Sequence, residues 1–244
     1  MVGEAMRIHC LQHVPFENPG TILTWAARKN HSLGSTHLYK EYVFPSQEDF
    51  DWLFVMGGPM NIYDEEHYPW LADEKRFIKA SIEAGKVVIG LCLGAQLIAD
   101  VLGGEVTRNR HTEIGWFPVT LTKAAKNYEP FTVFPEMHTV FQWHGDTFST
   151  LPEEAVLLAT SRVCAHQAFM YKKRVVGFQY HLENTRETIA ALVEKCADEM
   201  IPSLFVQEGE EMLSHEEHIE HCNILMDRFL DRLENLYEKG ELHE

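Results

Sequence analysis

The chain has 244 residues, of which 45% are hydrophobic, so it is long enough to bury a full core as one large domain, or as one domain with an appendage. Its formal net charge is −16, from 21 basic and 37 acidic side chains, and no basic run is present, which argues against electrostatic binding to nucleic acid or to an anionic membrane. There is neither a charged and then apolar leader at Met1 nor an apolar run of about 18 residues, so we expect a cytoplasmic protein, neither secreted nor membrane-spanning.

The first part of the chain alternates between predicted strands and helices. Apolar, β-branched runs predict strands, and apolar residues at helical spacing predict helices. In chain order these are a strand at 6–13, a helix at 19–28, a strand near 36–42, a strand at 52–56, a helix at about 71–83, a strand at 86–91 and a helix at 95–102. Strands that alternate with helices are typical of a parallel sheet covered on both faces, with the ligand site at the carboxyl ends of its strands.

After Gly103-Gly104 the pattern changes to short strands, which we interpret as a more antiparallel extension of the sheet. They are predicted at 105–107, 114–122, 139–143, 155–160 and 165–171. A core-like strand at 174–180 and a helix at 186–199 follow. We therefore expect an α/β fold with a mostly parallel central sheet flanked by helices, an antiparallel extension and C-terminal helices.

The tail from residue 202 to 244 is polar and has a helical pattern. Its apolar residues come close to forming a stripe, which would dock on the domain or on a partner. These residues are Ile219, Cys222, Leu225, Phe229, Leu233 and Leu236. We expect one domain over 1–200 and a C-terminal helical appendage over 201–244, packed on the same domain.

Cys92 is the candidate nucleophile. It lies in the turn between the strand at 86–91 and the following helix, and Gly90 and Gly94 flank it. A sharp strand-to-helix turn strains the backbone and leaves no room for a β-carbon nearby, which glycine tolerates. The helix start favours a thiolate and can stabilise an oxyanion. The alternative is a buried core cysteine, although packing alone would not call for two glycines.

His181 and Glu183 are the candidate base and its orienting carboxylate. They follow the core-like strand and are separated by one residue, so in an extended chain end their side chains can emerge on the same side. Glu183 can then hold one imidazole nitrogen while the other accepts the proton of Cys92. An H-x-E pattern is weak by itself in a chain with 14 histidines, where a surface histidine is the alternative. Its position after a core strand favours the catalytic interpretation.

No cofactor or metal is predicted. The five cysteines are odd in number and lack C-x-x-C pairs or zinc spacing, which fits reduced thiols. Three histidines within 215–221 lack the H-E-x-x-H arrangement, so a solvated acidic helix face is the favoured interpretation. The sequence has no G-x-x-x-x-G-K loop, and we do not expect this chain alone to use ATP.

Several separated motifs between residues 52 and 183 carry a family resemblance. They are GLCLGAQ at 90–96, Gly57-Gly58-Pro59, QYHLE at 179–183, EIGW at 113–116 and WHGD at 143–146. With these motifs the chain resembles the class I glutamine amidotransferases, whose glutaminase domain uses a Cys-His-Glu triad in this chain order. The stretch GGPMNIYDEEHYPWL at 57–71, with no evident synthetase domain, makes it most similar to standalone members related to the amidotransferase part of guanylate synthetase.

The resemblance implies a flavodoxin-like fold and a triad of Cys92, His181 and Glu183. It implies that the cysteine attacks the side-chain amide of glutamine to form a thioester, and that ammonia passes to an unknown acceptor; whether a synthetase is the partner is left open. The backbone N–H groups of Gly58 and Leu93 would hold the oxyanion. By the same matching, the substrate-binding residues are Gly57, Gln96, Trp143, His144 and Gly145. From the residues alone, two alternatives stay open: Gln96 is a residue on the surface of a helix, and His144-Gly145 is an ordinary turn.

One position departs from the family pattern, because Leu182 stands where the family usually has proline. A proline would fix φ at about −65° and pre-set the angle between the histidine and the glutamate. Leu182 leaves that segment freer but keeps both reacting groups. The geometry between His181 and Glu183 is therefore left open.

Other functions are consistent with the sequence. A γ-glutamyl peptide hydrolase would use the same triad on the same glutamyl head, with an amino acid or peptide as the leaving group. A non-catalytic regulatory protein of the same fold is a second alternative, against which the intact Cys92, His181 and Glu183 argue. In a cysteine hydrolase of the α/β-hydrolase type an acid precedes the histidine, so an adjacent H-x-E is not expected.

Overall fold

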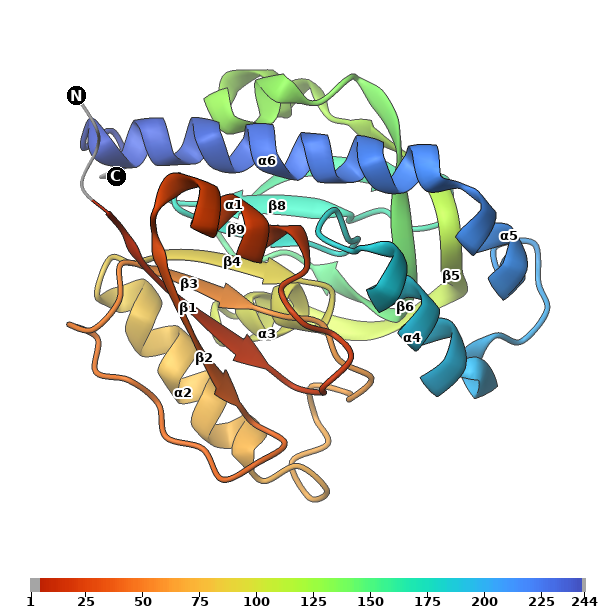
Figure 1. The fold of residues 1–244 in the computed structure, drawn as a ribbon, viewed down its shortest axis with the longest axis horizontal. Coiled ribbons are helices and arrows are strands. Elements are labelled where there is room, and N and C mark those ends of the chain that lie inside the picture. Colours follow the sequence, from red (N-terminus) through yellow and green to blue (C-terminus); the bar gives the residue numbers. More distant parts are fainter. Residues whose placement is uncertain (1–4, 243–244) are drawn as a thin grey trace.

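A nine-stranded mixed sheet forms the centre of the molecule (Figure 1), and the computed structural model describes residues 5–242. The order of strands across the sheet is β2-β1-β3-β4-β9-β8-β7-β5-β6. The strands are β1 (Arg7–Gln12), β2 (Ser32–His37), β3 (Trp52–Val55), β4 (Val87–Leu91), β5 (Glu105–Leu121), β6 (Met137–Thr150), β7 (Val156–Ser161), β8 (Ala168–Tyr171) and β9 (Val175–Phe178).

The sheet combines a parallel half with an antiparallel half. Strands β2, β1, β3, β4 and β9 pair in parallel, and β9, β8, β7, β5 and β6 pair in antiparallel fashion. The side chains of β3 alternate between two hydrophobic clusters, with Trp52 and Phe54 in one and Leu53 and Val55 in the other. The predicted α/β fold with an antiparallel extension is therefore confirmed.

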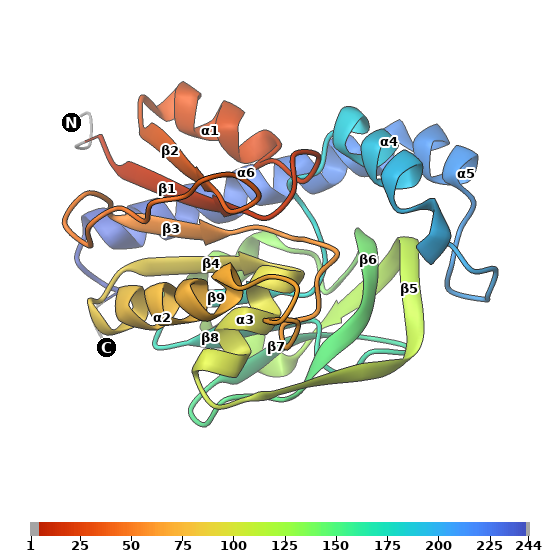
Figure 2. The same cartoon turned by 90° about the horizontal axis from the view of Figure 1, so that it is seen from below.

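Helices cover both faces of this sheet (Figure 2). They are α1 (Thr21–Lys29), α2 (Trp70–Glu83), α3 (Leu93–Val101), α4 (Arg186–Lys195), α5 (Gly209–Ser214) and α6 (Glu216–Glu238), with short 3-10 turns η1 (Lys123–Asn127), η2 (Glu129–Val133) and η3 (Ala197–Glu199). Helices α1 and α6 pack into the cluster that contains Trp52, and α2 and α3 pack into the cluster that contains Leu53.

Several strand predictions were wrong in their bounds. The strand expected at 139–143 is part of the longer β6, which pairs with β5 as far as Thr150. The strand expected near 36–42 is β2 at Ser32–His37, an edge strand that pairs only with β1, and its polar, glycine-containing sequence gives no apolar run. The strands expected at 105–107 and 114–122 are one long strand, β5. The chain stays alongside β6 across a register shift between Arg108 and Glu113, although the connecting residues are polar.

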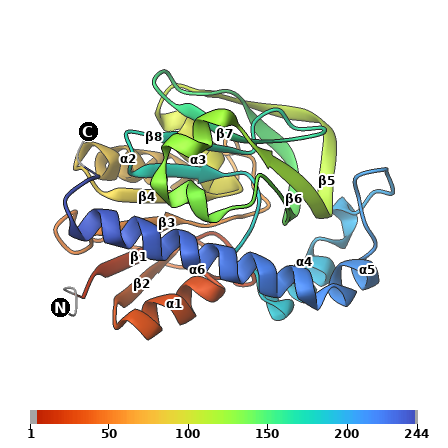
Figure 3. The same ribbon diagram turned by 90° about the horizontal axis from the view of Figure 1, so that it is seen from above.

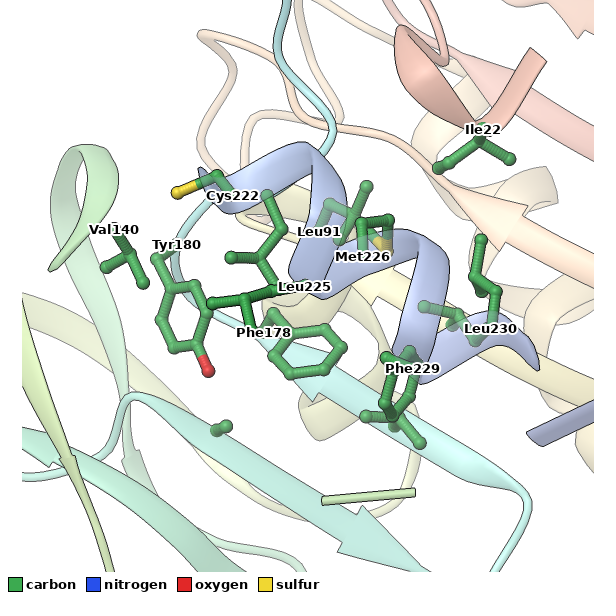
Figure 4. Packing of buried hydrophobic residues seen from close by; sticks show 14 of the residues in the cluster. Ile22, Leu91, Val140, Phe178, Tyr180, Cys222, Leu225, Met226, Phe229 and Leu230 are labelled. Atoms are coloured by element: carbon green, nitrogen blue, oxygen red, sulfur yellow. The ribbon is translucent and has the colours of Figure 1, made fainter. Parts of the chain in front are cut away.

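The long helix α6 crosses most of the molecule on one face of the sheet (Figure 3). Its apolar side contacts Phe178 and Tyr180 at the end of β9 (Figure 4), and all six residues of the predicted apolar stripe are buried. After α6, the Leu242 carbonyl accepts a 3.5 Å hydrogen bond from Arg174, just before β9. Within residues 5–242, no helix combines the length and apolar content that a membrane crossing requires. The division of the chain near residue 200 stays a prediction.

Candidate active site

Four loops that follow neighbouring parallel strands meet at one edge of the sheet. Strands β1, β3, β4 and β9 lie side by side. The residues that follow them include His13, Gly57, Cys92 and His181. Because the carboxyl ends of parallel strands share one edge, this is where an α/β fold binds its ligand.

Cys92 occupies a strained turn between β4 and α3. Its φ is 49° and its ψ is −106°, a conformation that residues other than glycine rarely adopt. The backbone around it is crowded: a Cβ on Gly90 would lie 2.5 Å from the carbonyl carbon of Gly94, and a Cβ on Gly94 would lie 2.0 Å from the Val55 carbonyl oxygen. This close approach explains both glycines.

The thiol of Cys92 is buried among polar groups. Its Sγ donates to the Trp143 carbonyl at 3.4 Å, and Gln179 Nε2 donates to Sγ at 3.7 Å. Burial raises the pKa of the thiol, while hydrogen bonding and charge from His181 oppose that effect. A thiolate at this position therefore depends on an imidazolium at His181.

His181 and Glu183 form a buried hydrogen bond of 2.6 Å between Nδ1 and Oε1. Burial would lower the pKa of His181, but the Glu183 carboxylate and Cys92 raise it well above its ordinary value. With Nδ1 held by the glutamate, Nε2 is left for the thiol. The structure thus brings the three residues of the predicted triad into one constellation.

Leu182 compensates for the missing proline. Its backbone N–H donates to Glu183 Oε2 at 3.0 Å, a bond that proline cannot make. The segment is also held from outside, because Asn223 of α6 donates to the Leu182 carbonyl at 3.0 Å and to the Asn184 carbonyl at 2.9 Å. These contacts fix the segment that carries the histidine and the glutamate.

The Gly57-Gly58 loop lies against the start of α3. A Cβ on Gly58 would lie 2.9 Å from Leu93 Cδ2, and the Gly94 N–H donates to the Met56 carbonyl at 3.1 Å. Among the described residues, the N–H groups of Gly58 and Leu93 have no backbone acceptor. The Leu93 N–H is directed at the Cys92 thiol, where it opposes the rise in pKa that burial causes.

A cavity of about 850 Å³ opens onto Cys92. Its walls include six residues expected from the sequence, which are Gly58, Cys92, Gln96, Trp143, His144 and Gly145. Gln96 is buried and donates to the Asp146 carbonyl at 3.1 Å and to Gln179 Oε1 at 3.2 Å, so it is not a helix-surface residue. Arg108 lies against Gly145, where an added Cβ would come within 2.0 Å of Nη1, and its guanidinium lies 3.5 Å from Asp146 Oδ1 at this side of the cavity.

The imidazole of His144 belongs to a buried network. Its Nδ1 lies 2.9 Å from the Asp146 carbonyl, and its Nε2 lies 3.2 Å from Glu113 Oε2. Glu113 also accepts from Ser161 Oγ at 2.9 Å and from Gln167 Nε2 at 2.8 Å. The ring is therefore engaged within the protein, between β6 and the buried Glu113.

Two groups of side chains bring metal-ligating atoms within 4.8 Å of one another. They are Glu113, His144 and Cys164, and His215, Glu217 and His218. In the first group, the hydrogen bonds just described already engage the carboxylate. The second lies around the start of α6, where His215 Nδ1 contacts the exposed Glu217 at 2.8 Å. In neither group are the residues spaced along the sequence as the ligands of a typical structural zinc site are.

Three residues of this edge were missed from the sequence, namely Glu17, His13 and Glu74. Glu17 lines the cavity, and burial raises its pKa to about 7. His13 Nδ1 lies 2.8 Å from the Gly57 carbonyl oxygen and its Nε2 2.8 Å from Glu74 Oε1. Two signals were present: His13 ends the first predicted strand at the ligand edge, and Glu74 lies on the apolar side of a predicted helix.

Comparisons with known proteins agree on one family. The model of glutamine amidotransferase class-I matches residues 22–199. The glutamine amidotransferase-like protein YfeJ of Salmonella typhimurium is 33% identical over 235 residues, which cover 93% of this chain and 97% of YfeJ. The glutamine-hydrolyzing GMP synthase of Bacillus cytotoxicus is 35% identical over 132 residues, which cover 54% of this chain and 24% of the synthase.

A solved structure gives the same answer for the fold. The crystal structure of a glutamine amidotransferase from Thermotoga maritima has a TM-score of 0.83 and 30% identity, covering 94% of this chain and 98% of that protein. Because the family model spans most of the chain and YfeJ aligns over nearly its full length, this protein belongs to the class-I glutamine amidotransferase family.

Proposed function

We propose that this protein hydrolyses the side-chain amide of glutamine through a thioester on Cys92 and passes the ammonia to an acceptor that is still unknown. The observation that carries the proposal is the convergence, at one sheet edge, of a strained cysteine at a helix N-terminus and the buried His181–Glu183 pair. Family membership supports glutamine as the source of the amide.

In the first half-reaction, Cys92 Sγ attacks the γ-carbonyl carbon and its proton passes to His181 Nε2. The N–H groups of Gly58 and Leu93 hold the charge that develops on the carbonyl oxygen. The C–N bond then breaks, and His181 gives its proton to the departing nitrogen. Ammonia leaves, and a γ-glutamyl thioester remains on Cys92.

In the second half-reaction, water attacks the thioester carbonyl and gives one proton to His181 Nε2. The C–S bond breaks, glutamate is released, and the proton returns to Cys92. Glu183 orients the ring through its hydrogen bond to Nδ1 and stabilises the imidazolium.

The α-amino and α-carboxylate groups of the substrate bind at the wall that Gln96, Gly145 and the backbone of Trp143 form. Arg108 Nη1 and Asp146 Oδ1 lie 3.5 Å apart beside this wall. Such a pair offers both signs of charge to a zwitterionic amino-acid head. Gly57 and His144 act here through the backbone segments that they carry.

A γ-glutamyl peptide hydrolase is the second candidate: the cavity has room for a larger leaving group, but the acidic subsite proposed below would disfavour the anionic leaving group of a dipeptide. Pockets for drug-sized ligands have volumes of about 300–1,000 Å³. The volume of this cavity, about 850 Å³, lies in that range, so the cavity can hold a ligand larger than glutamine. A synthetase partner stays a proposal as well, supported by the match to GMP synthase, of which this chain covers 24%.

The decisive experiment combines an assay of glutamate and ammonia release from glutamine with trapping by an electrophilic glutamine analogue. Mass spectrometry of the digested protein should find one adduct, on Cys92, and the other four cysteines act as internal controls. Loss of activity should follow the extent of this adduct. An active protein with no adduct on Cys92, or an adduct on another cysteine that inactivates it, would contradict the mechanism.

A further inference from the structure

Glu17 is a buried carboxylate in the cavity that the mechanism above does not use. It lies in the loop after β1 and lines the cavity together with Cys92, with only 7% of the residue exposed. Within residues 5–242 its carboxylate oxygens receive no hydrogen bond from another side chain or N–H group. Because the carboxylate faces the cavity and has no hydrogen-bond donor among the described residues, it can accept a hydrogen bond from a ligand.

Glu17 lies close to His181, the residue that protonates the leaving group in the proposed mechanism. A Cβ on Gly57 would lie 2.2 Å from Glu17 Oε2 and 3.0 Å from His181 Cε1, so the carboxylate and the imidazole converge over the same backbone. The leaving nitrogen takes its proton from His181, which brings that nitrogen next to Glu17. The amino-acid head binds elsewhere, at Gln96 and Gly145.

The charged groups around Glu17 compensate its negative charge only in part. His13, His181, Glu183 and Glu199 are the groups that act on it. Each histidine is already paired with a carboxylate of its own, His13 with Glu74 and His181 with Glu183. Glu199, which also lines the cavity, adds a second acidic group.

Building on the proposed function, we propose that Glu17 forms the leaving-group subsite and selects γ-glutamyl amides of ammonia, of neutral amines or of cationic amines against γ-glutamyl dipeptides. During C–N cleavage Glu17 accepts a hydrogen bond from an N–H of the scissile nitrogen, and His181 supplies the proton that completes the free amine. In a γ-glutamyl dipeptide, the carbon attached to this nitrogen carries a carboxylate. Two like charges would then lie close together in a buried site, which disfavours binding and cleavage.

The test uses the full chain and three probes with leaving groups of similar size. They are γ-glutamylglycine, γ-glutamylglycinamide and mono-γ-glutamyl-ethylenediamine, whose leaving groups are anionic, neutral and cationic. The kcat/KM for glutamate release at about pH 8 should be about tenfold or more lower for the anionic probe than for the neutral one. The cationic probe should be cleaved at least as well as the neutral one. If the anionic probe is cleaved as well as the other two, the assignment is wrong.

Two variants attribute this preference to Glu17. Glu17→Gln keeps the shape and removes the charge, so the ratio of anionic to neutral turnover should rise by about tenfold. Glu17→Asp keeps the charge and should keep the order of the three probes. Because the ratio is taken within one enzyme, a partly folded variant does not change it. If the ratio is unchanged in Glu17→Gln while the protein still hydrolyses glutamine, the assignment of Glu17 is wrong and the proposed function stands. If the wild-type protein cleaves neither glutamine nor any probe, the proposed function itself is wrong.

Discussion

Glu74 and His13 form a fully buried hydrogen bond of 2.8 Å between Oε1 and Nε2, and the same imidazole reaches the Gly57 carbonyl oxygen at 2.8 Å through Nδ1. Burial would lower the pKa of His13, but the charge of Glu74 raises it above its ordinary value, so the ring donates in both directions. The Gly57 carbonyl and the Gly58 N–H share one peptide plane. His13 therefore fixes the direction of a proposed oxyanion donor.

We expect Glu74→Gln to lower kcat for glutamine by about tenfold to a hundredfold with a smaller change in KM, because the oxyanion donor is aimed less well. The matched control is Glu234→Gln, which removes the carboxylate from another buried pair, with His31, whose Nε2–Oε1 distance is 3.0 Å. Both variants should lower the melting temperature, but only Glu74→Gln should lower kcat. Equal kcat values for the two variants would contradict this role.

Leu182→Pro restores the residue usual in the family and should lower kcat by about tenfold in the folded protein. The change removes the N–H that donates to Glu183 Oε2 at 3.0 Å and leaves a buried carboxylate oxygen without that partner, at a cost of about 1–3 kcal/mol. Leu182→Ala is the control, since it loses the packing of a fully buried side chain but keeps the N–H. Steady-state kinetics and thermal unfolding separate the two effects. A proline variant with wild-type kcat would show that the bond has no catalytic importance.

Asn223→Ala should lower the free energy of unfolding by about 1–3 kcal/mol and lower kcat several-fold. The amide donates two hydrogen bonds from α6 to the carbonyls that flank Glu183, those of Leu182 and Asn184. Asn235→Ala, at an exposed position of the same helix, should change neither quantity much. Denaturant unfolding and kinetics check both. Were Asn223→Ala to lose stability but keep kcat, α6 would contribute only to stability.

Glu17→Gln should stabilise the protein at neutral and higher pH. The pKa of Glu17 is about 7 in the folded protein against an ordinary value of 4.5, so the folded state favours the neutral acid. Wild-type stability therefore falls as pH rises between these two values and levels off above about 7. The free energy of unfolding of Glu17→Gln should therefore exceed that of the wild type by about 3 kcal/mol at about pH 8, and by about 1 kcal/mol at about pH 5. Denaturant unfolding of both proteins at these two pH values measures it, and a gap that stays constant with pH would refute the assignment of this pKa.

Sequence patterns predicted the central elements well, because strands such as Trp52–Val55 are buried on both faces and must be apolar throughout. They failed at the edge strand β2, where Ser32 and Gly34 leave no such pattern. The turn at Cys92 could be expected from its two glycines, because the tightly packed backbone there leaves no room for a Cβ atom at Gly90 or Gly94.

The surroundings of the site could not be predicted in the same way. Glu17 and His13 come from one loop, Glu74 from α2 and Asn223 from α6, and each acts only through contacts that the fold creates over long distances in sequence. The effect of Leu182 was open for the same reason, since a backbone N–H leaves no mark in a sequence pattern. The catalytic roles of Cys92, His181 and Glu183 stay predictions until the trapping experiment is done.

The hydrogen bond between Arg174 and the Leu242 carbonyl has a practical consequence. It holds the end of the C-terminal region at the edge of the sheet where β9 begins, and β1 begins at this same edge (Figure 1). Cys92 lies at the opposite edge, after β4. A group attached near the starts of β1 and β9 would therefore lie at the edge of the sheet away from the mouth of the cavity.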